Sequence, residues 1–240
     1  MKRSEINTII ANGVSFLHEM GFLLPPFASW SAADWRSKGP EVSEIVAAQL
    51  GWDITDFGRG DFGRVGLLLF TIRNGSLAGA RPTPGRTYAE KILIVRENQI
   101  TPTHYHRQKM EDIINRGGGN LIIQLWNSLT DGSLADTPVL VGIDGVRVAL
   151  PAGGTVALKP GESVCLPPRL YHKFWGEPGR GPVLVGEVSS VNDDRVDNVF
   201  HEMVGRFPAV EEDAEPRHLL TLDYPQHYPH HAPPLSTSPH

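Results

Sequence analysis

Beyond the first quarter of the chain, the sequence is a series of short apolar runs that glycine or proline interrupts, and this pattern most constrains the fold. Two examples are "VGLLLFTIRNG" at 65–75, which ends in an Asn-Gly turn signal, and "GPVLVGEVSSV" at 181–191. Several runs show β-branched alternation, as half-buried strands do. The 25 Gly and 20 Pro among 240 residues favour turns between short strands over long helices. The sequence therefore predicts a mainly β fold, an antiparallel sandwich or barrel of roughly eight to eleven strands.

Two segments before these runs are expected to be helical. The stretch "SEINTIIANGVSFLHEMG" spaces its apolar residues at helical intervals, with Ser4 as a candidate N-cap and Gly21 as the stop. The stretch "SEIVAAQLG" at 43–51 predicts a second helix. The expected organisation is an N-terminal helical arm at 1–55 packed on a barrel at 56–200, a C-terminal extension at 201–225, and a disordered His/Pro-rich tail at 226–240.

The net charge and the cysteine content limit which classes of partner and which cellular compartment fit the sequence. A net charge of -5 and the absence of any Lys/Arg run give no basic surface for nucleic acid or an anionic membrane. No uncharged stretch reaches the length of a membrane span, and the N-terminus turns polar too soon for a signal peptide. The single cysteine, Cys165, excludes an intrachain disulfide and fits a reducing cytoplasm. We therefore expect a cytoplasmic protein with a small-molecule ligand.

The stretch "THYHRQKME" at 103–111 contains a candidate metal site. Residues two apart on a strand share a face, so His104 and His106 can direct two imidazoles to one point. Glu111 follows at the opposite parity, so a turn through "RQK" is needed to bring it back on the neighbouring strand. Three donors still leave a metal ion short of ligands. "KPGESVCLPPRLYHKFW" offers His172, which follows a strand framed by glycine and proline.

These two spaced units resemble the first and second motifs of the cupin superfamily, in which three histidines and a glutamate hold a divalent metal inside a small β-barrel or jelly roll. The resemblance makes His104, His106, Glu111 and His172 the metal ligands. The second motif departs at Arg169, where the family usually has glycine, which alters a turn and not a ligand. The competing interpretation is a metal-free cupin whose histidines are hydrogen-bonded core residues.

Four further polar residues lie where strand parity or sequence proximity brings them toward this site. Glu187 shares a face with apolar Val183 and Val185, Lys109 precedes Glu111 by two residues, and Lys91 shares a face with Leu93. Asp194 belongs to a charged turn after the Glu187 strand. The alternatives are a solvated loop lysine at Lys109, a solvent-facing rim position for Glu187, and a solvated acidic turn for Asp194. We list them as candidate substrate contacts: Lys91, Lys109, Glu187 and Asp194.

Longer stretches, among them "AEKILIVRENQITPTHYHRQKMEDIINRGGGNL" and "GEVSSVNDDRVDN", resemble the bacterial D-lyxose isomerase branch of the cupins over most of residues 1 to 225. The resemblance implies a cytoplasmic, homodimeric aldose-ketose isomerase that prefers Mn²⁺, with Co²⁺ or another divalent metal as alternatives. Its implied substrates are monosaccharides, interconverted as D-lyxose with D-xylulose and D-mannose with D-fructose. A cupin dioxygenase with a more apolar pocket and a non-catalytic sugar-binding cupin are the alternatives.

Isomerisation through an enediol or enediolate needs a base for the carbon-bound proton and an acid on the oxygen side. We assign the carbon-bound proton to Glu187 and the oxygen side to Lys109. Glu111 is the competing base, because a ligand carboxylate can also take this role. The residue pattern leaves that choice open.

Overall fold

The computed structural model describes residues 1–75, 85–191, 193–205 and 209–230. The helices are α1 (Arg3–Glu19), α2 (Ala32–Arg36), α3 (Ser43–Ala47), α4 (Asp194–Asp197) and α5 (Tyr224–His227), with short 3₁₀ turns η1 (Pro26–Ser29), η2 (Pro40–Val42) and η3 (Thr221–Asp223). The strands are β1 (Gly51–Thr55), β2 (Leu67–Arg73), β3 (Tyr88–Val95), β4 (Thr101–His106), β5 (Glu111–Gly118), β6 (Leu121–Trp126), β7 (Val139–Ile143), β8 (Val146–Leu150), β9 (Gly154–Leu158), β10 (Ser163–Leu166), β11 (Tyr171–Gly176), β12 (Val183–Ser190) and β13 (Asn198–Phe200). No helix in these ranges is long and apolar enough to cross a membrane.

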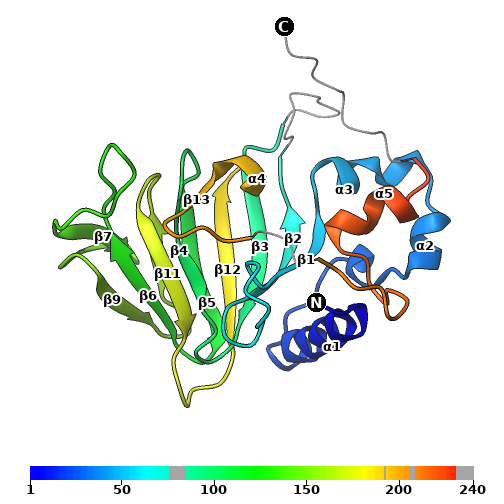
Figure 1. Ribbon diagram of the computed structural model, residues 1–240, viewed down its shortest axis with the longest axis horizontal. Helices are drawn as coiled ribbons and strands as arrows, with labels where there is room; N and C mark the ends of the chain where they lie inside the picture. The colour runs from blue at the N-terminus through cyan, green and yellow to red at the C-terminus, as the bar shows by residue number, and fades with distance from the viewer. Residues whose placement is uncertain (76–84, 192, 206–208, 231–240) are drawn as a thin grey trace, which may run out of the picture.

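The strands form two antiparallel sheets that face one another, which confirms the predicted mainly β, cupin-like barrel (Figure 1). One sheet has the order β1-β2-β3-β12-β5-β10-β7-β8, and the other has the order β13-β4-β11-β6-β9. More strands form than the sequence pattern predicted, because edge strands such as β13 are too short to show alternation. The division into arm, barrel, extension and tail stays a prediction; β1 lies before residue 56 yet pairs with β2, and residues 231–240 of the tail lie outside the described part.

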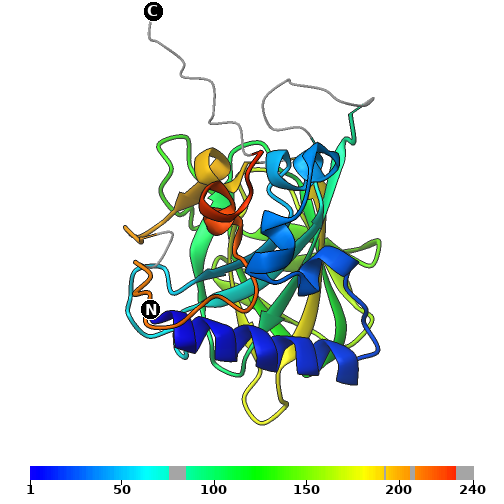
Figure 2. The same cartoon turned by 90° about the vertical axis from the view of Figure 1, so that its right-hand side faces the viewer.

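Helix α1 and the N-terminal helical segments cover the outer face of β1, β2 and β3 (Figure 2). On that face, Leu68, Phe70 and Ile94 pack with Ile6 and Ile10 of α1. Strands covered on both faces are apolar at nearly every position, which explains the uninterrupted runs in β2 and β3. The predicted helices are confirmed, although α3 is only five residues long.

The inner face of the larger sheet changes from apolar to charged along its strands. On β12, Val183 and Val185 belong to the barrel core, and Glu187 follows them on the same face. On β3, Leu93 lies in the same core and Lys91 pairs in register with Glu187. Because neighbouring strands change at the same level, one end of the barrel interior is a packed core and the other is a charged cavity.

Contacts across the whole chain tie α1 to the C-terminal extension. The guanidinium of Arg3, 2% exposed, donates to Asp223 at 2.9 Å and to Glu212 at 2.7 Å. The prediction of Ser4 as the N-cap was wrong, because the helix begins at Arg3 and the Ser4 hydroxyl donates to Asp213 at 2.7 Å. Asp213 Oδ1 also accepts from the amide of Ser4 at 2.9 Å, so a distant carboxylate takes the capping role that sequence rules give to the local hydroxyl.

Replacing Tyr224 with phenylalanine is expected to lower the free energy of unfolding at neutral pH. It should also make that free energy fall less steeply as the pH rises above 10. The hydroxyl of Tyr224 donates to Leu50 O at 2.6 Å, and losing this donor in a buried site costs about 1–3 kcal/mol. Burial raises the pKa of Tyr224 above its ordinary value of 10.0. The folded state therefore holds this proton more tightly than the unfolded state, so the contribution is complete below pH 10 and is lost as pH rises.

Chemical denaturation between pH 7 and 11 measures both effects. The matched control is Tyr88→Phe, since Tyr88 is 46% exposed and should leave the free energy of unfolding unchanged. The free energy of unfolding of Tyr224→Phe will still fall somewhat with rising pH, because burial also raises the pKa of Tyr171 and Tyr228. Equal slopes for wild type and Tyr224→Phe would contradict the prediction.

Candidate metal centre and active site

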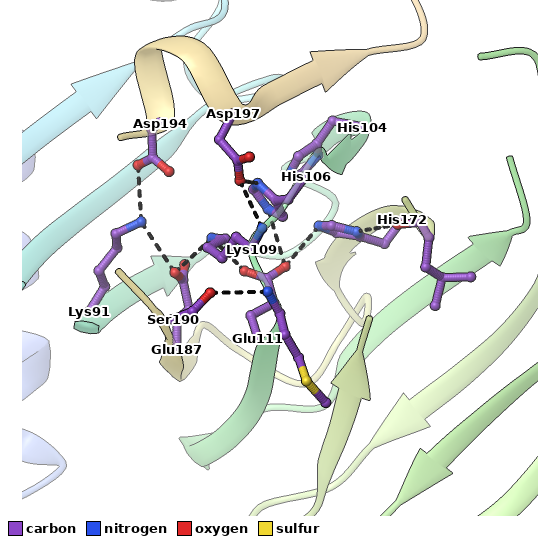
Figure 3. Close-up of polar contacts among 12 residues, drawn as sticks. Lys91, His104, His106, Lys109, Glu111, His172, Glu187, Ser190, Asp194 and Asp197 are labelled. Carbon is purple, nitrogen blue, oxygen red and sulfur yellow. Dashed lines mark hydrogen bonds and ion pairs between the residues drawn. The ribbon is translucent and has the colours of Figure 1, made fainter. Parts of the chain in front are cut away.

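Three histidines and one glutamate meet at the charged end of the barrel (Figure 3). His104 and His106 lie on β4 and His172 on β11, and their candidate ligand nitrogens are all within 4.8 Å of one another. Glu111, at the start of β5, places Oε1 at 3.3 Å from His106 Nε2 and 3.2 Å from His172 Nε2. Four donors from both sheets therefore surround one point.

The other nitrogen of each ring faces outward. His104 Nδ1 lies 2.7 Å from Pro102 O, and His172 Nδ1 lies 3.1 Å from Leu170 O. A carbonyl oxygen can only accept, so Nδ1 carries the hydrogen in both rings and Nε2 keeps its lone pair. Outer contacts of this kind fix the tautomer of metal-binding histidines.

Burial sets the charge state of the site. It lowers the pKa of His104 well below its ordinary value of 6.5, and the neighbouring His172 and His106 act in the same direction. Burial also lowers the pKa of His106, with a contribution from Lys109. Neutral imidazoles are the form that binds metal ions.

The turn between the two histidines and Glu111 differs in one respect from the sequence interpretation. Glu111 does return toward His106, but β4 and β5 belong to opposite sheets, so the prediction that β5 is the neighbouring strand was wrong. The turn crosses the barrel at its open end. A single five-residue spacing thereby delivers ligands from both walls.

The expectation that Arg169 alters only a turn fits the structure, since this residue has φ 65°, the left-handed conformation that glycine usually takes.

Lys109 lies between two carboxylates and is not the solvated loop lysine of the alternative interpretation. It is 2% exposed, and its Nζ lies 2.6 Å from Glu111 Oε2 and 2.8 Å from Glu187 Oε1. Burial alone would lower the pKa of Lys109, but Glu111 and Glu187 outweigh it and raise that pKa above its ordinary value of 10.5. The ammonium ion is thus held firmly charged. Burial would raise the pKa of Glu111, but the ammonium of Lys109 holds it well below its ordinary value of 4.5.

Glu187 extends this network toward the cavity mouth and is 5% exposed, so the solvent-facing alternative was wrong. Lys91 Nζ lies 3.2 Å from Glu187 Oε1 and 3.0 Å from Asp194 Oδ2. The acidic turn is likewise not simply solvated, because Asp194 contacts this buried lysine and Asp197, 8% exposed, approaches His106.

The charges of this network favour a divalent cation. Its four carboxylates belong to Glu111, Glu187, Asp194 and Asp197, and its two ammonium groups belong to Lys91 and Lys109. With neutral histidines, two negative charges remain in a largely buried site, which is unfavourable without a counter-ion. Glu111 Oε1 is also buried and has no hydrogen-bond donor among the described residues. The donor set and the excess charge both fit a bound M²⁺ ion.

The network lines one cavity with about 690 Å³ of space free of protein atoms, part of it open to solvent. Several residues that line this cavity were not predicted from the sequence, among them Asp53, Thr101, Asn198 and Phe200. Asp53 could have been found, because it shares a face with Thr55 on a short strand. Asn198 had no such signal, since β13 is three residues long. Asn198 Oδ1 and Thr101 Oγ1 are buried and lack partners among the described residues, so they add hydrogen-bonding capacity to the wall.

The fold and the site define a class: a cupin-like barrel with a three-histidine, one-glutamate centre beside a lysine and a second glutamate. A family model described as D-lyxose isomerase matches residues 1–224, and the chain belongs to this family. It is an aldose-ketose sugar isomerase.

Individual relatives agree with this placement. The chain is 49% identical over 227 residues to a D-lyxose/D-mannose isomerase of Escherichia coli O157:H7, covering 94% of this chain and 99% of that protein. It is 50% identical over 225 residues to a protein of the same name from Serratia proteamaculans, covering 93% and 98%. The solved structure of Cellulomonas parahominis L-ribose isomerase with L-ribose is similar in fold, with a TM-score of 0.56, 18% identity and coverage of 88% and 98%. The L-ribose isomerase of Geodermatophilus obscurus gives a TM-score of 0.55 at 16% identity, covering 88% and 98%.

Proposed function

We propose that this isomerase interconverts D-lyxose with D-xylulose and D-mannose with D-fructose through an enediol or enediolate. About half of the residues are identical to those of two proteins named D-lyxose/D-mannose isomerase. The observation that carries the chemistry is Lys109, whose ammonium joins the candidate ligand Glu111 to Glu187 inside the cavity. Dioxygenase chemistry was expected to need a more apolar pocket, and these charged side chains argue against it.

We propose His104, His106, Glu111 and His172 as ligands of Mn²⁺, with Co²⁺ or another divalent ion as alternatives. The convergent nitrogens and the two excess negative charges support this set. When bound, such an ion supplies a Lewis acid that polarises the carbonyl group of an open-chain sugar. The preference for manganese rests on the family resemblance.

We propose that Glu187 moves the carbon-bound proton and that Lys109 supplies charge or a proton on the oxygen side. Glu111 is the weaker candidate base, because Lys109 occupies its Oε2 and two histidines face its Oε1. Glu187 is positioned by two ammonium groups that both contact its Oε1. Lys91, Lys109, Glu187 and Asp194 are the proposed sugar contacts.

Incubation of the Mn²⁺-loaded protein with D-lyxose or D-mannose in heavy water tests the proposal. We expect the matching ketose to form, with deuterium at C1 or C2 detected by NMR, because a side chain that exchanges with solvent carries the proton. L-Ribose is the comparison substrate, since the structural relatives are L-ribose isomerases of lower identity. Conversion of L-ribose alone, or oxygen uptake without ketose, would refute the assignment.

Removal of the metal ion is expected to abolish turnover and leave the barrel folded. The barrel core lies at the apolar end of the lumen and does not include the four ligands. Dialysis against a chelator, with activity and circular dichroism recorded before and after adding Mn²⁺, measures both. Full activity in the chelated protein, confirmed metal-free by elemental analysis, would contradict the proposed metal centre.

A homodimer in the cytoplasm is proposed from the family resemblance. Light scattering coupled to size exclusion measures the mass of the particle in solution. A mass near twice 26.3 kDa is expected.

A further inference from the structure

We propose that Asp197 is a positioning residue that holds both His106 and the turn carrying Lys109 in place for metal binding and catalysis. The inference rests on the proposed function for the role of Lys109, but its effect on metal binding is independent of the sugar. Asp197 is the last residue of α4, and it was not among the site residues predicted from the sequence.

The first observation is the grip of Asp197 on the turn that crosses the barrel. Its Oδ1 accepts from the amide of Gln108 at 2.9 Å, and its Oδ2 accepts from the amide of Lys109 at 3.2 Å. Its carbonyl oxygen accepts from the amide of Arg107 at 3.0 Å. Three successive turn residues therefore bind one residue of α4. Lys109 extends from this turn, so its backbone position depends on Asp197.

The second observation is the position of Asp197 beside His106. Asp197 Oδ2 lies 3.6 Å from His106 Nδ1, slightly beyond hydrogen-bond length, while His106 Nε2 faces Glu111 at 3.3 Å. His106 Nδ1 is buried and has no hydrogen-bond partner among the described residues. A buried ring N–H requires an acceptor, and this carboxylate is the charged group beside it (Figure 3).

The third observation separates His106 from the other two histidines. His104 and His172 direct Nδ1 to backbone carbonyls two residues before them in the chain, whereas His106 faces a carboxylate from a distant segment. A carboxylate behind a metal-bound imidazole fixes the tautomer and increases ligand basicity. Pairing of Asn198 with His106 in register brings Asp197 to this place. The single side chain thus connects one metal ligand with the lysine of the reaction.

The test uses Asp197→Asn in the full-length, metal-free protein, titrated with Mn²⁺ alone by calorimetry. Metal affinity is expected to fall about 10- to 100-fold, the effect typical of removing such an outer carboxylate. Asparagine has the size of aspartate, but its side-chain NH₂ is a donor. It therefore replaces one carboxylate acceptor that faces either a turn amide or the ring N–H of His106. Ser190→Ala is the matched control: the Ser190 hydroxyl accepts from the next turn amide, that of Met110, at 3.3 Å and is not among the contacts of His106. It should keep wild-type metal affinity.

A second measurement reads the tautomer of His106 directly, first in the wild type and then in Asp197→Asn. Long-range ¹⁵N–¹H NMR of the metal-free wild type should show His106 protonated at Nδ1, and Asp197→Asn should shift it toward the other tautomer. An Nε2-protonated His106 in wild type, or unchanged metal affinity in folded Asp197→Asn, would overturn the proposal. Equal losses of metal affinity in Asp197→Asn and Ser190→Ala would also overturn the proposal, because they would show that Asp197 acts through the turn alone and not through His106. If metal affinity falls as expected in a protein that converts no sugar, the proposed function fails while the role of Asp197 at His106 stands.

Discussion

Replacement of Glu187 by glutamine is expected to reduce kcat by about 10²- to 10⁴-fold, the usual contribution of a general base. Glutamine has the same shape but cannot accept the carbon-bound proton. The four candidate metal ligands do not include Glu187, so metal content should remain at the wild-type value. Steady-state kinetics, elemental analysis and deuterium incorporation from heavy water measure these quantities separately.

The comparison with Glu111→Gln decides between the two candidate bases. Glu111 lies 3.2 Å and 3.3 Å from two histidine nitrogens, so Glu111→Gln should lose metal affinity together with rate. Asp194→Asn is a milder control at the cavity mouth, where its side chain is 25% exposed, and is expected to raise KM more than it lowers kcat. Unchanged turnover in metal-replete Glu187→Gln would return the proton transfer to Glu111.

Replacement of Lys109 by methionine is expected to destabilise the metal-free protein by about 3–5 kcal/mol, the cost of leaving buried charges without their partner. Lys109 contacts Glu111 at 2.6 Å and Glu187 at 2.8 Å, and both carboxylates are almost inaccessible to water. Methionine fills similar volume but supplies no charge. Activity should also fall, because the oxygen side of the reaction loses its ammonium. Urea denaturation of chelated and Mn²⁺-loaded protein measures the stability change.

Two controls isolate the electrostatic origin of this loss. The double variant Lys109→Met/Glu111→Gln removes the carboxylate that loses its ammonium partner, whereas Glu187 keeps Lys91, so it should be more stable than Lys109→Met alone. Lys91→Met should cost less, because Glu187 retains Lys109 and the Asp194 side chain, 25% exposed, retains water. A double variant no more stable than Lys109→Met would show that lost packing, rather than unpaired charge, explains the effect.

Much of the candidate metal centre was predictable because its residues are close in sequence and their spacing obeys strand geometry. His104 and His106 share a face on β4 as parity requires, and the glycine and proline around His172 marked the strand that precedes it. The inward position of Glu187 also followed from parity, since Val183 and Val185 on the same face are core residues. Local rules of this kind depend only on backbone geometry.

Other parts of the site depend on contacts between distant segments. Asp197 reaches His106 from a segment about ninety residues further along the chain. Its contacts with Gln108 and Lys109 span 89 and 88 residues. A solvated acidic turn stayed open as the alternative for Asp194, because Asp residues in loops are usually exposed to water. Asn198 and Phe200 belong to a strand too short to carry a pattern. The capping role predicted for Ser4 is taken by Asp213, which also comes from a distant part of the chain.

The sequence by itself determined the mainly β class, the four candidate ligands and the lysine and glutamate beside them, because period-two alternation and turn residues act over a few positions. Only the tertiary structure decided that β4 and β5 lie in opposite sheets, that Lys109 is buried between Glu111 and Glu187, and that Asp197 supports His106. Charge and burial depend on which segments meet in space, and those meetings are set by the packing of the whole chain.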